Sequence, residues 1–351
     1  MPGATGSEPG NRGGNDAMAT VYYDADADLG LVQARKVAVL GFGVQGEAHA
    51  RNLRDSGCEV RVGLRVGSRS RDRAAAAGLP VAAPDEAAAW ADLVALLVPD
   101  ADQPGVFERE VAPHLKPGDA LLFAHGFSVH FGQLTPPDGV DVVLVAPKGP
   151  GAAVREQYQR GRGVPVLLAV AQDASGKAWD LAKSYAMALG GTRAGALVTT
   201  FQEETETGLF GAHAVLGGGV VALARAAYDA LVAAGHQPEV AYLACVHELG
   251  IAAELLQRDG LAGMTRALSE VAEYGGGTRG ARLAGEATVA ELGRILDEAA
   301  SGAFAREWLD EHAAGLPTLG RLREAAREHP AERTGRTVRA GMPWLDGAQE
   351  D

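Results

Sequence analysis

The apolar residues of the chain follow two different patterns, one before about residue 198 and one after it. From Val21 to about Leu197, short runs rich in Val and Leu alternate with Ala-rich stretches of helical spacing. The runs are VAVLGFG, EVRVGL, DLVALLVP, DALLFAHG, VDVVLVAP and VPVLLAV. Strands that alternate with helices in this way form a parallel sheet whose two faces are covered by helices. The pattern therefore predicts an α/β domain over residues 21–198.

Helical spacing dominates the chain after about Thr199. Two long stretches, AVLGGGVVALARAAYDALVAAG and PEVAYLACVHELGIAAELLQRDG, each end at a glycine, a common residue at the end of a helix. We therefore expect residues 199–346 to form an all-helical domain.

Both ends of the chain differ in composition from the two domains. Residues 1–20 are rich in Gly, Pro, Ser and Asn, a composition that cannot bury enough apolar surface to offset the entropy of ordering. We expect a disordered extension there. The segment after Arg321 is charged as far as MPWL, so we expect it to wrap the surface and dock Trp344 and Leu345, with residues 347–351 as a tail.

The charge of the chain excludes one class of partner. With 45 acidic and 32 basic residues the net charge is −13, whereas a nucleic-acid-binding protein needs a basic face. Cys58 and Cys245 lie in apolar stretches without metal-ligand spacing, which favours reduced, buried thiols and a cytoplasmic protein. No apolar run reaches the ~18 residues of a membrane span, so we expect no membrane association.

The first motif with a chemical meaning is KVAVLGFGVQGEAHARNLRDSG, which sets Gly41, Gly43 and Gly46 between a predicted strand and a predicted helix. Glycines at this spacing permit a tight turn and let the backbone approach a pyrophosphate at the helix N-terminus. A second predicted strand follows at residues 59–64. This context favours a dinucleotide-binding, Rossmann-type domain over a Gly-rich turn with a structural role alone.

The end of that second strand indicates which dinucleotide is preferred. An NAD site would carry an acid there for the ribose hydroxyls, but this chain has Arg65, followed by Ser68, Arg69 and Ser70. A guanidinium and two hydroxyls suit the 2′-phosphate of NADP. The alternative is that Arg65 and Arg69 are ordinary solvated charges.

Taken in order along the chain, a series of short stretches resembles the ketol-acid reductoisomerase family, in its short form. The stretches are GFGVQGEAHA, VGLRVGSRS, VPDADQ, FAHGFSVHFG, VAPKGPG, GVPVLLAVAQDASG, GGTRAG, TTFQEETETGLFG, AGHQPEVAY, HELG, GLAGM, AEYG, EHP and MPWL. The resemblance implies an oxidoreductase with a Rossmann-type NADP domain, followed by a knotted helical domain. It also implies a homodimer, or a multiple of dimers, whose active sites are completed across the dimer.

The resemblance also assigns individual residues. AHGFSVH places the family's active-site histidine at His125, and APKGPG places its lysine at Lys148. A glutamate of the helical domain falls at Glu248 and a substrate-contacting serine at Ser269. The motifs that match the cofactor site add further expected contacts, namely Phe42, Gln45, Pro99, Asp100, Gln103 and Gly126.

Three departures from the family concern its metal ligands. The family has an aspartate at the position of Gly208, and glutamates at the positions of Ala212 and Ala244. Of the four expected acidic ligands only Glu248 is retained. Mg²⁺ needs several oxygen ligands in near-octahedral order, so we expect no tight Mg²⁺ site in this chain.

The lost carboxylates change the reaction that we expect. In the family, Mg²⁺ ions act as Lewis acids during an alkyl migration in a 2-hydroxy-2-alkyl-3-oxo acid, and hydride transfer from NADPH follows. Hydride transfer needs only a positioned nicotinamide and a donor to the oxygen, roles that Lys148 and His125 can fill. We therefore expect redox activity without metal-assisted isomerisation.

Other polar residues near the lost ligands have two interpretations each. Glu203, Glu204 and Glu206 either favour a positively charged group together with Glu248, or form a solvated helix start. His213 stands where the family usually has glutamine, and is either a substrate-site acid or base or an ordinary polar helix residue.

Three functions remain open from the sequence. The first is a repurposed NADP-dependent enzyme of specialised metabolism that acts on a small hydroxy or oxo carboxylic acid. Its reaction could be simple oxidation or reduction, or hydride transfer coupled to carbon–carbon bond formation, such as closure of a cyclopropanol ring with loss of a leaving group. The second is a genuine ketol-acid reductoisomerase of branched-chain amino acid biosynthesis. The third is a non-catalytic NADP-binding protein.

Overall fold

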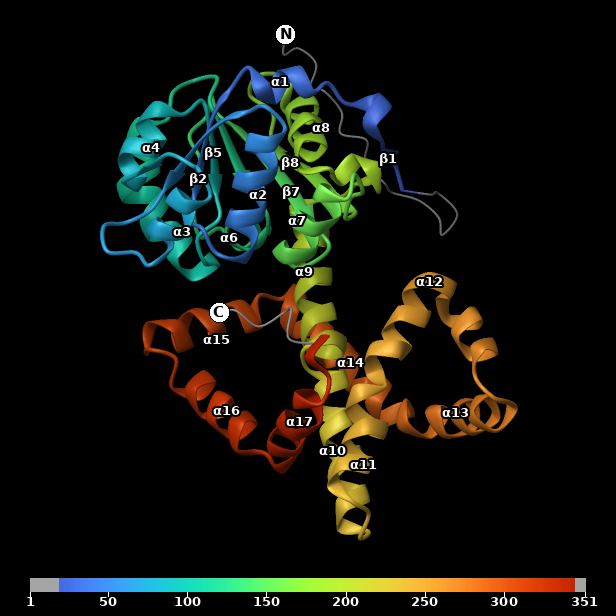
Figure 1. Cartoon of the computed structure of the whole chain (residues 1–351). Coiled ribbons are helices and arrows are strands. Elements are labelled where there is room, and N and C mark those ends of the chain that lie inside the picture. The colour runs from blue at the N-terminus through green and yellow to red at the C-terminus, as the bar shows by residue number, and fades with distance from the viewer. Residues whose placement is uncertain (1–18, 345–351) are drawn as a thin grey trace. The chain divides into compact units, whose positions relative to one another are not determined.

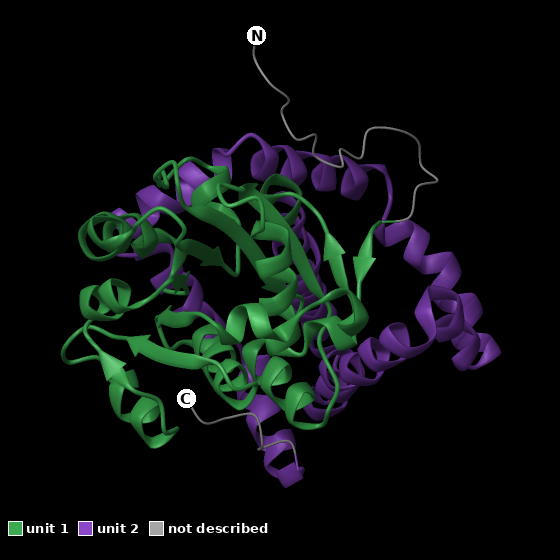
Figure 2. Ribbon diagram, turned by 90° about the horizontal axis from the view of Figure 1, so that it is seen from above, with its two compact units in different colours: residues 1–205 green, residues 206–351 purple. Residues whose placement is uncertain are grey.

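The structure is a computed structural model that describes residues 19–344. It divides into two compact units, residues 1–205 and residues 206–351 (Figure 2). The division falls inside helix α9 (Phe201–Phe210), later in the chain than the expected boundary after residue 198. Most of the expected N-terminal extension, residues 1–18, lies outside the described residues, as do Leu345 and the tail 347–351.

The first unit is built on one nine-stranded sheet (Figure 1). The strand order is β1-β9-β8-β7-β6-β5-β2-β3-β4. The strands are β1 (Val21–Tyr22), β2 (Lys36–Leu40), β3 (Glu59–Gly63), β4 (Val81–Ala82), β5 (Leu93–Leu96), β6 (Ala120–Phe123), β7 (Asp141–Pro147), β8 (Val166–Gln172) and β9 (Ala196–Val198). Each of the six predicted strand runs contains one of them.

The sheet is mixed rather than wholly parallel, which corrects the expectation from the sequence. Strands β3, β2, β5, β6 and β7 are parallel, but β8 runs antiparallel to β7 and β1 antiparallel to β9. Pro147 at the end of β7 pairs with Val166 at the start of β8. Strand β8 therefore starts at the same edge of the sheet at which β7 ends, so the two strands have to be antiparallel.

Helices cover both faces of this sheet, as expected. They are α1 (Leu29–Gln33), α2 (Val44–Asp55), α3 (Ser70–Ala76), α4 (Pro84–Trp90), α5 (Gln103–Val106), α6 (Phe127–His130), α7 (Gly151–Gln159) and α8 (Ala178–Leu189). Alternate residues of β2 serve opposite faces, because side chains alternate along a strand. Val37 and Val39 join a core with α1, α2 and α8, whereas Ala38 and Leu40 join a core with α4.

Within the described residues, the second unit contains helices alone, which confirms the predicted helical domain. After α9 come α10 (Gly219–Ala233), α11 (Pro238–Tyr242), α12 (Leu249–Ala267), α13 (Glu270–Leu283), α14 (Glu286–Ala300), α15 (Ala303–Ala313), α16 (Pro317–Glu328) and α17 (Pro330–Ala340). Gly260 breaks α12 with a φ of 70°. The predicted stop at this glycine is therefore present as a kink.

Two π-helical turns interrupt the helices of this unit. They are η6 (Gly211–Leu216), between α9 and α10, and η7 (Leu243–His247), between α11 and α12. Single π turns often occur at functional sites, because the wider turn re-aims the side chains that follow it. These two turns contain Ala212 and Ala244, two of the three positions where the resemblance leads us to expect acidic metal ligands.

One expectation for the second unit is wrong. The charged segment after Arg321 forms most of α16 and α17 rather than an extended wrap, and Trp344 is 75 % exposed. The helix Phe201–Ala233 is also long and apolar enough to cross a membrane by length and composition, although the sequence suggested no such run. None of the apolar window of this helix is buried.

Candidate functional site

The Gly-rich turn between β2 and α2 has the geometry that a dinucleotide site needs. Gly41 has a φ of +104°, and a Cβ there would lie 2.7 Å from the carbonyl oxygen of Leu97. A Cβ on Gly46 would lie 2.3 Å from the carbonyl oxygen of Gly41, whereas a Cβ on Gly43 would meet nothing within 4 Å. Gly41 and Gly46 thus permit the tight turn, and Gly43 leaves open the side from which a pyrophosphate approaches.

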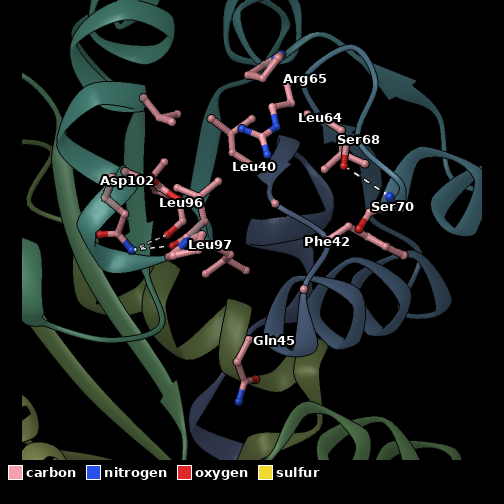
Figure 3. Close-up of a pocket in the computed structure, with 18 of the residues that line it drawn as sticks. Leu40, Phe42, Gln45, Leu64, Arg65, Ser68, Ser70, Leu96, Leu97 and Asp102 are labelled. Atoms are coloured by element: carbon pink, nitrogen blue, oxygen red, sulfur yellow. Dashed lines mark hydrogen bonds between the residues drawn. The ribbon is translucent and has the colours of Figure 1, made fainter. Parts of the chain in front are cut away.

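A cavity of about 630 Å³ opens at this turn (Figure 3). Ligand pockets usually measure about 300 to 1,000 Å³. Eleven of the expected site residues line it, namely Gly41, Phe42, Gly43, Gln45, Arg65, Ser68, Ser70, Pro99, Asp100, Gln103 and His125. Gly46 and Gly126 are not in the lining; a Cβ on Gly46 would meet the backbone of Gly41, and a Cβ on Gly126 would meet the first turn of α9. The residues present therefore fit an extended dinucleotide.

One end of the cavity carries the residues expected to select the dinucleotide. Arg65, Ser68 and Ser70 lie together there, and Ser68 Oγ accepts a hydrogen bond from the backbone N–H of Ser70 at 3.3 Å (Figure 3). Arg71 donates to the carbonyl oxygen of Leu64 at 2.5 Å and so fastens the loop to the end of β3. Arg65 is exposed and lines the cavity, so it is available to a ligand.

Another part of the lining belongs to the loop after β5. The side-chain amide of Gln103 donates to the carbonyl oxygen of Val98 at 3.2 Å and to Asp100 Oδ1 at 3.2 Å. Burial raises the pKa of Asp100, His125 opposes that rise, and Glu204 adds to it. Gln103 therefore fixes the loop that holds Pro99 and Asp100 against the cavity.

His125 and Lys148 follow β6 and β7, and both lie near one buried carboxylate, that of Glu204. His125 Nδ1 lies 3.0 Å from Glu204 Oε2, and the backbone N–H of Gly126 donates to the same oxygen at 2.9 Å. Lys148 Nζ lies 3.9 Å from Glu204 Oε1. The structure thus brings together two residues that the resemblance identified and a third that it did not.

Within this cluster, His125 and Glu204 each favour the charged form of the other. Burial opposes the charged form of His125, but the hydrogen bond and charge of Glu204 prevail and the pKa of His125 is raised. Burial likewise opposes ionisation of Glu204, yet His125, Gly126 and Lys148 hold its pKa below the usual range. The pair is therefore stable as a carboxylate beside an imidazolium.

Glu204 is the residue to which the sequence assigned no definite role. Its side chain is 4 % exposed, so the interpretation of residues 203–206 as a solvated helix start is wrong at this position. Glu203 is exposed, with Oε2 accepting from Thr199 Oγ1 at 2.6 Å. The helical spacing of Phe201, Glu204 and Thr205, all buried in the first turn of α9, is the signal that could have identified it.

The remaining expected site residues belong to the second unit. Glu248 is exposed at the end of η7, and Ser269 caps α13 by accepting from the backbone N–H of Ala272. His213 lies in η6, where its ring centroid is 4.2 Å from that of Phe304. Burial lowers the pKa of His213 while Glu298 opposes the fall. Among the described residues of this unit, no hydrogen bond or ion pair joins Glu248, Ser269 and His213 to one another.

The positions of the family's metal ligands do not fit a pair of divalent ions. Gly208, Ala212 and Ala244 offer no side-chain oxygen. Across residues 19–344, no three or more side chains of His, Cys, Asp or Glu are grouped to hold a metal ion. Hard cations need several such oxygens, so the residues present do not fit a pair of Mg²⁺ ions.

A Gly-rich turn at the end of a parallel strand, beside an extended cavity lined by a histidine that pairs with a buried glutamate, is typical of nicotinamide-dependent oxidoreductases. Comparison with known proteins then gives the family. The NADPH-binding domain of acetohydroxy acid isomeroreductase matches residues 31–195, and the C-terminal domain of ketol-acid reductoisomerase matches residues 201–344. The chain belongs to the ketol-acid reductoisomerase family.

Solved structures agree with this assignment. An NADH-preferring ketol-acid reductoisomerase from an uncultured archean is 39 % identical, with a TM-score of 0.89 over 92 % of this chain and 98 % of that one. A semialdehyde dehydrogenase NAD-binding protein from Cupriavidus necator, solved with calcium and NAD, is 20 % identical, with a TM-score of 0.59 over 76 % of this chain and 98 % of that one. The second likeness concerns the fold alone.

Proposed function

We propose that this family member is an NADP(H)-dependent oxidoreductase of a small hydroxy or oxo carboxylic acid, and that it has lost the metal-assisted isomerisation. The observation that carries the proposal is the absence of side-chain oxygens at Gly208, Ala212 and Ala244. Removing three anionic ligands leaves too few oxygens for two Mg²⁺ ions. Alkyl migration depends on those ions as Lewis acids, whereas carbonyl reduction does not.

In this proposal, residues of the first unit carry out the redox step. A bound nicotinamide would supply the hydride. Lys148 offers an ammonium that can hold a carboxylate or polarise a carbonyl, and His125 offers a ring nitrogen for the proton. The substrate-binding roles of Glu248, Ser269 and His213 stay expectations from the family resemblance.

The preference for NADP(H) rests on Arg65, Ser68 and Ser70 at one end of the cavity. A guanidinium beside two hydroxyls forms charge-assisted hydrogen bonds with a 2′-phosphate. The archaeal relative is described as NADH-preferring, so the preference differs within the family. The affinities of this chain for NADPH and NADH therefore have to be measured side by side.

A metal titration with a restored variant tests the proposal. We expect the wild-type protein to bind no Mg²⁺ tightly by calorimetry and to oxidise NADPH with 2-oxo acids at a rate that Mg²⁺ does not change. The matched variant Gly208→Asp/Ala212→Glu/Ala244→Glu should gain Mg²⁺ binding. Turnover of 2-acetolactate by the wild type that requires Mg²⁺ would refute the proposal.

A genuine ketol-acid reductoisomerase is the second candidate, and the 39 % identity to the archaeal enzyme favours it. The Mg²⁺-dependent assay with 2-acetolactate separates it from the first. A non-catalytic NADP-binding protein would bind NADPH without turnover. Within neither unit does a contact favour ring closure over simple redox chemistry, so that reaction stays an expectation from the sequence.

We further propose that the protein is a cytoplasmic homodimer, or a multiple of it, held by the second unit. Large apolar side chains are exposed there, among them Leu261 at 80 % and Val271 at 85 %. The apolar window of Phe201–Ala233 is also unburied. Exposed apolar surface of this extent is typical of a protein interface. A second copy of the chain is the occupant that the proposal commits to.

A further inference from the structure

The pairing of His125 with Glu204 goes beyond what a pocket lining requires. His125 lines the cavity, whereas Glu204 does not and lies behind it. His125 Nδ1 faces Glu204 Oε2 at 3.0 Å. The other ring nitrogen, Nε2, makes no hydrogen bond within residues 19–344. This atom is also not fully buried. One nitrogen is therefore held by the protein, and the other is accessible to a ligand.

The backbone holds Glu204 in this place. The N–H of Gly126 donates to Glu204 Oε2 at 2.9 Å, so the carboxylate is fixed to the same loop that carries His125. A Cβ on Gly126 would lie 2.4 Å from Thr205 Oγ1 and 2.7 Å from the carbonyl oxygen of Phe201. The first turn of α9 thus packs directly on this loop, and the carboxylate has little freedom to move.

The charged groups that face the His125 ring act in opposite directions. Glu204 on α9 and Asp100 on η2 (Asp100–Asp102) favour the imidazolium, and Lys148 after β7 opposes it. The contact with Glu204 is the shortest of these. Glu204 is thus the group whose removal should change the ring most.

We infer that Glu204 is a positioning residue: its carboxylate accepts the Nδ1–H of His125 and so leaves Nε2 to deliver the proton to the substrate oxygen. The inference rests on the proposed reduction. As the hydride reaches the carbonyl carbon, the C=O π bond breaks and its electron pair takes the proton from Nε2. The products are a hydroxyl group, oxidised nicotinamide and neutral His125, which solvent reprotonates.

This assignment gives the chain a proton source that uses no metal-bound water. A carboxylate that holds Nδ1–H fixes both the tautomer and the ring orientation, and it stabilises the imidazolium that acts as the acid. Glu204 does not line the cavity, so we assign its effect on the proton to its contact with His125.

The first test needs no turnover. In the wild-type protein, ¹⁵N chemical shifts of His125 should show that neutral His125 carries its proton on Nδ1. In Glu204→Gln the imidazolium loses its carboxylate, so His125 should titrate at lower pH. Glu203→Gln is the matched control, because that carboxylate is exposed and bonds Thr199 instead. Identical His125 titrations in the wild type and Glu204→Gln would overturn the inference.

Kinetics give the second readout. Reduction requires the acid form of His125, so kcat should fall as pH rises, and in Glu204→Gln that fall should occur at lower pH. We expect kcat at neutral pH to drop about tenfold or more, with the Kd of NADPH unchanged. Glu204→Asp keeps the charge and should recover part of the wild-type profile. A kcat loss with an unmoved pH profile would indicate a merely structural role and contradict the inference.

The two readouts separate this inference from the proposed function. If no 2-oxo acid is reduced but the His125 tautomer and titration depend on Glu204, the pairing stands and the proposed substrate class fails. If reduction occurs and the titration is independent of Glu204, the positioning role fails and the redox function stands.

Discussion

At the scale of single residues, the site shows what sequence resemblance can and cannot supply. His125 and Lys148 were carried over from short motifs, and the structure places both near Glu204. The role of Glu204 could not be predicted, because its partner His125 lies 79 positions away; helical spacing from Phe201 could at most have indicated that Glu204 is buried. Only the packing of α9 decides that Glu204 is buried and Glu203 is not.

Arg65 gives a prediction about the cofactor. Replacing it with alanine removes a guanidinium from the cavity end that should hold the 2′-phosphate, so the Kd of NADPH should rise about tenfold, as for loss of one charged hydrogen bond. The Kd of NADH should change little, since it has no 2′-phosphate. Fluorescence titration with both cofactors checks this. An unchanged ratio of the two Kd values would contradict the assignment of NADP(H).

His49 gives a prediction about acid stability. Its side chain is fully buried, and its Nδ1 lies 3.0 Å from Tyr185 Oη. Burial lowers the pKa of His49 to about 3. Below about pH 6.5, His49 becomes protonated in the unfolded chain but stays neutral in the folded chain. The contribution of His49 to the free energy of unfolding is therefore fully present above that pH and is lost as the pH falls. The loss is about 1.4 kcal/mol per pH unit.

Urea unfolding checks the His49 prediction. Between pH 6.5 and pH 5 the wild type should lose about 2 kcal/mol from this group. In His49→Gln that contribution should disappear, although the variant starts from a lower stability because its packing is altered. Equal pH dependence in the two proteins would show that His49 is not the responsible group.

At the scale of elements, the sequence predicted which segments form strands but not their direction. Alternating apolar runs are the same for parallel and antiparallel strands, so the sequence pattern alone predicts β8 as parallel. Its direction follows from Pro147 and Val166 pairing at one end of the sheet, a long-range fact. The π turns η6 and η7 were also not predicted, since periodicity does not distinguish a single wide turn from an α-helical one.

Gly151 tests the packing of two elements in the first unit. A Cβ on this first residue of α7 would lie 1.8 Å from the carbonyl oxygen of Val44, the first residue of α2. Gly151→Ala should therefore force the helices apart and cost roughly 1 to 3 kcal/mol of unfolding free energy. Chemical denaturation measures the cost. Gly320→Ala in α16, where a Cβ meets nothing within 4 Å, should instead be neutral or stabilising by up to ~1 kcal/mol.

At the scale of the whole molecule, the two units differ in how much apolar surface they bury. The first has two large cores, one on each face of its sheet. The core cluster of the second consists of Tyr228, Ala241 and Tyr242 with the side chains around them. The sequence predicted that this unit is helical, but its small core is a property of three-dimensional packing.

The dimer proposal makes a prediction at this scale. Leu223 on α10 is 53 % exposed, and aspartate there would place a charge in the proposed interface. Light scattering should give a dimer for the wild type and a smaller mass or weaker association for Leu223→Asp. Leu31→Asp, in α1 of the first unit, should leave the mass unchanged. A wild-type protein that is monomeric at micromolar concentration would contradict the proposal.

The two-residue strand β1 has a consequence for handling the protein. β1 pairs Val21 with Leu197 and Tyr22 with Ala196, and the backbone N–H of Val198 donates to the carbonyl oxygen of Thr20. A chain cut back beyond Tyr22 would leave the amides of β9 open as a template for strands from other molecules. Such a truncation should precipitate on concentration, at a rate that rises steeply with the amount of protein.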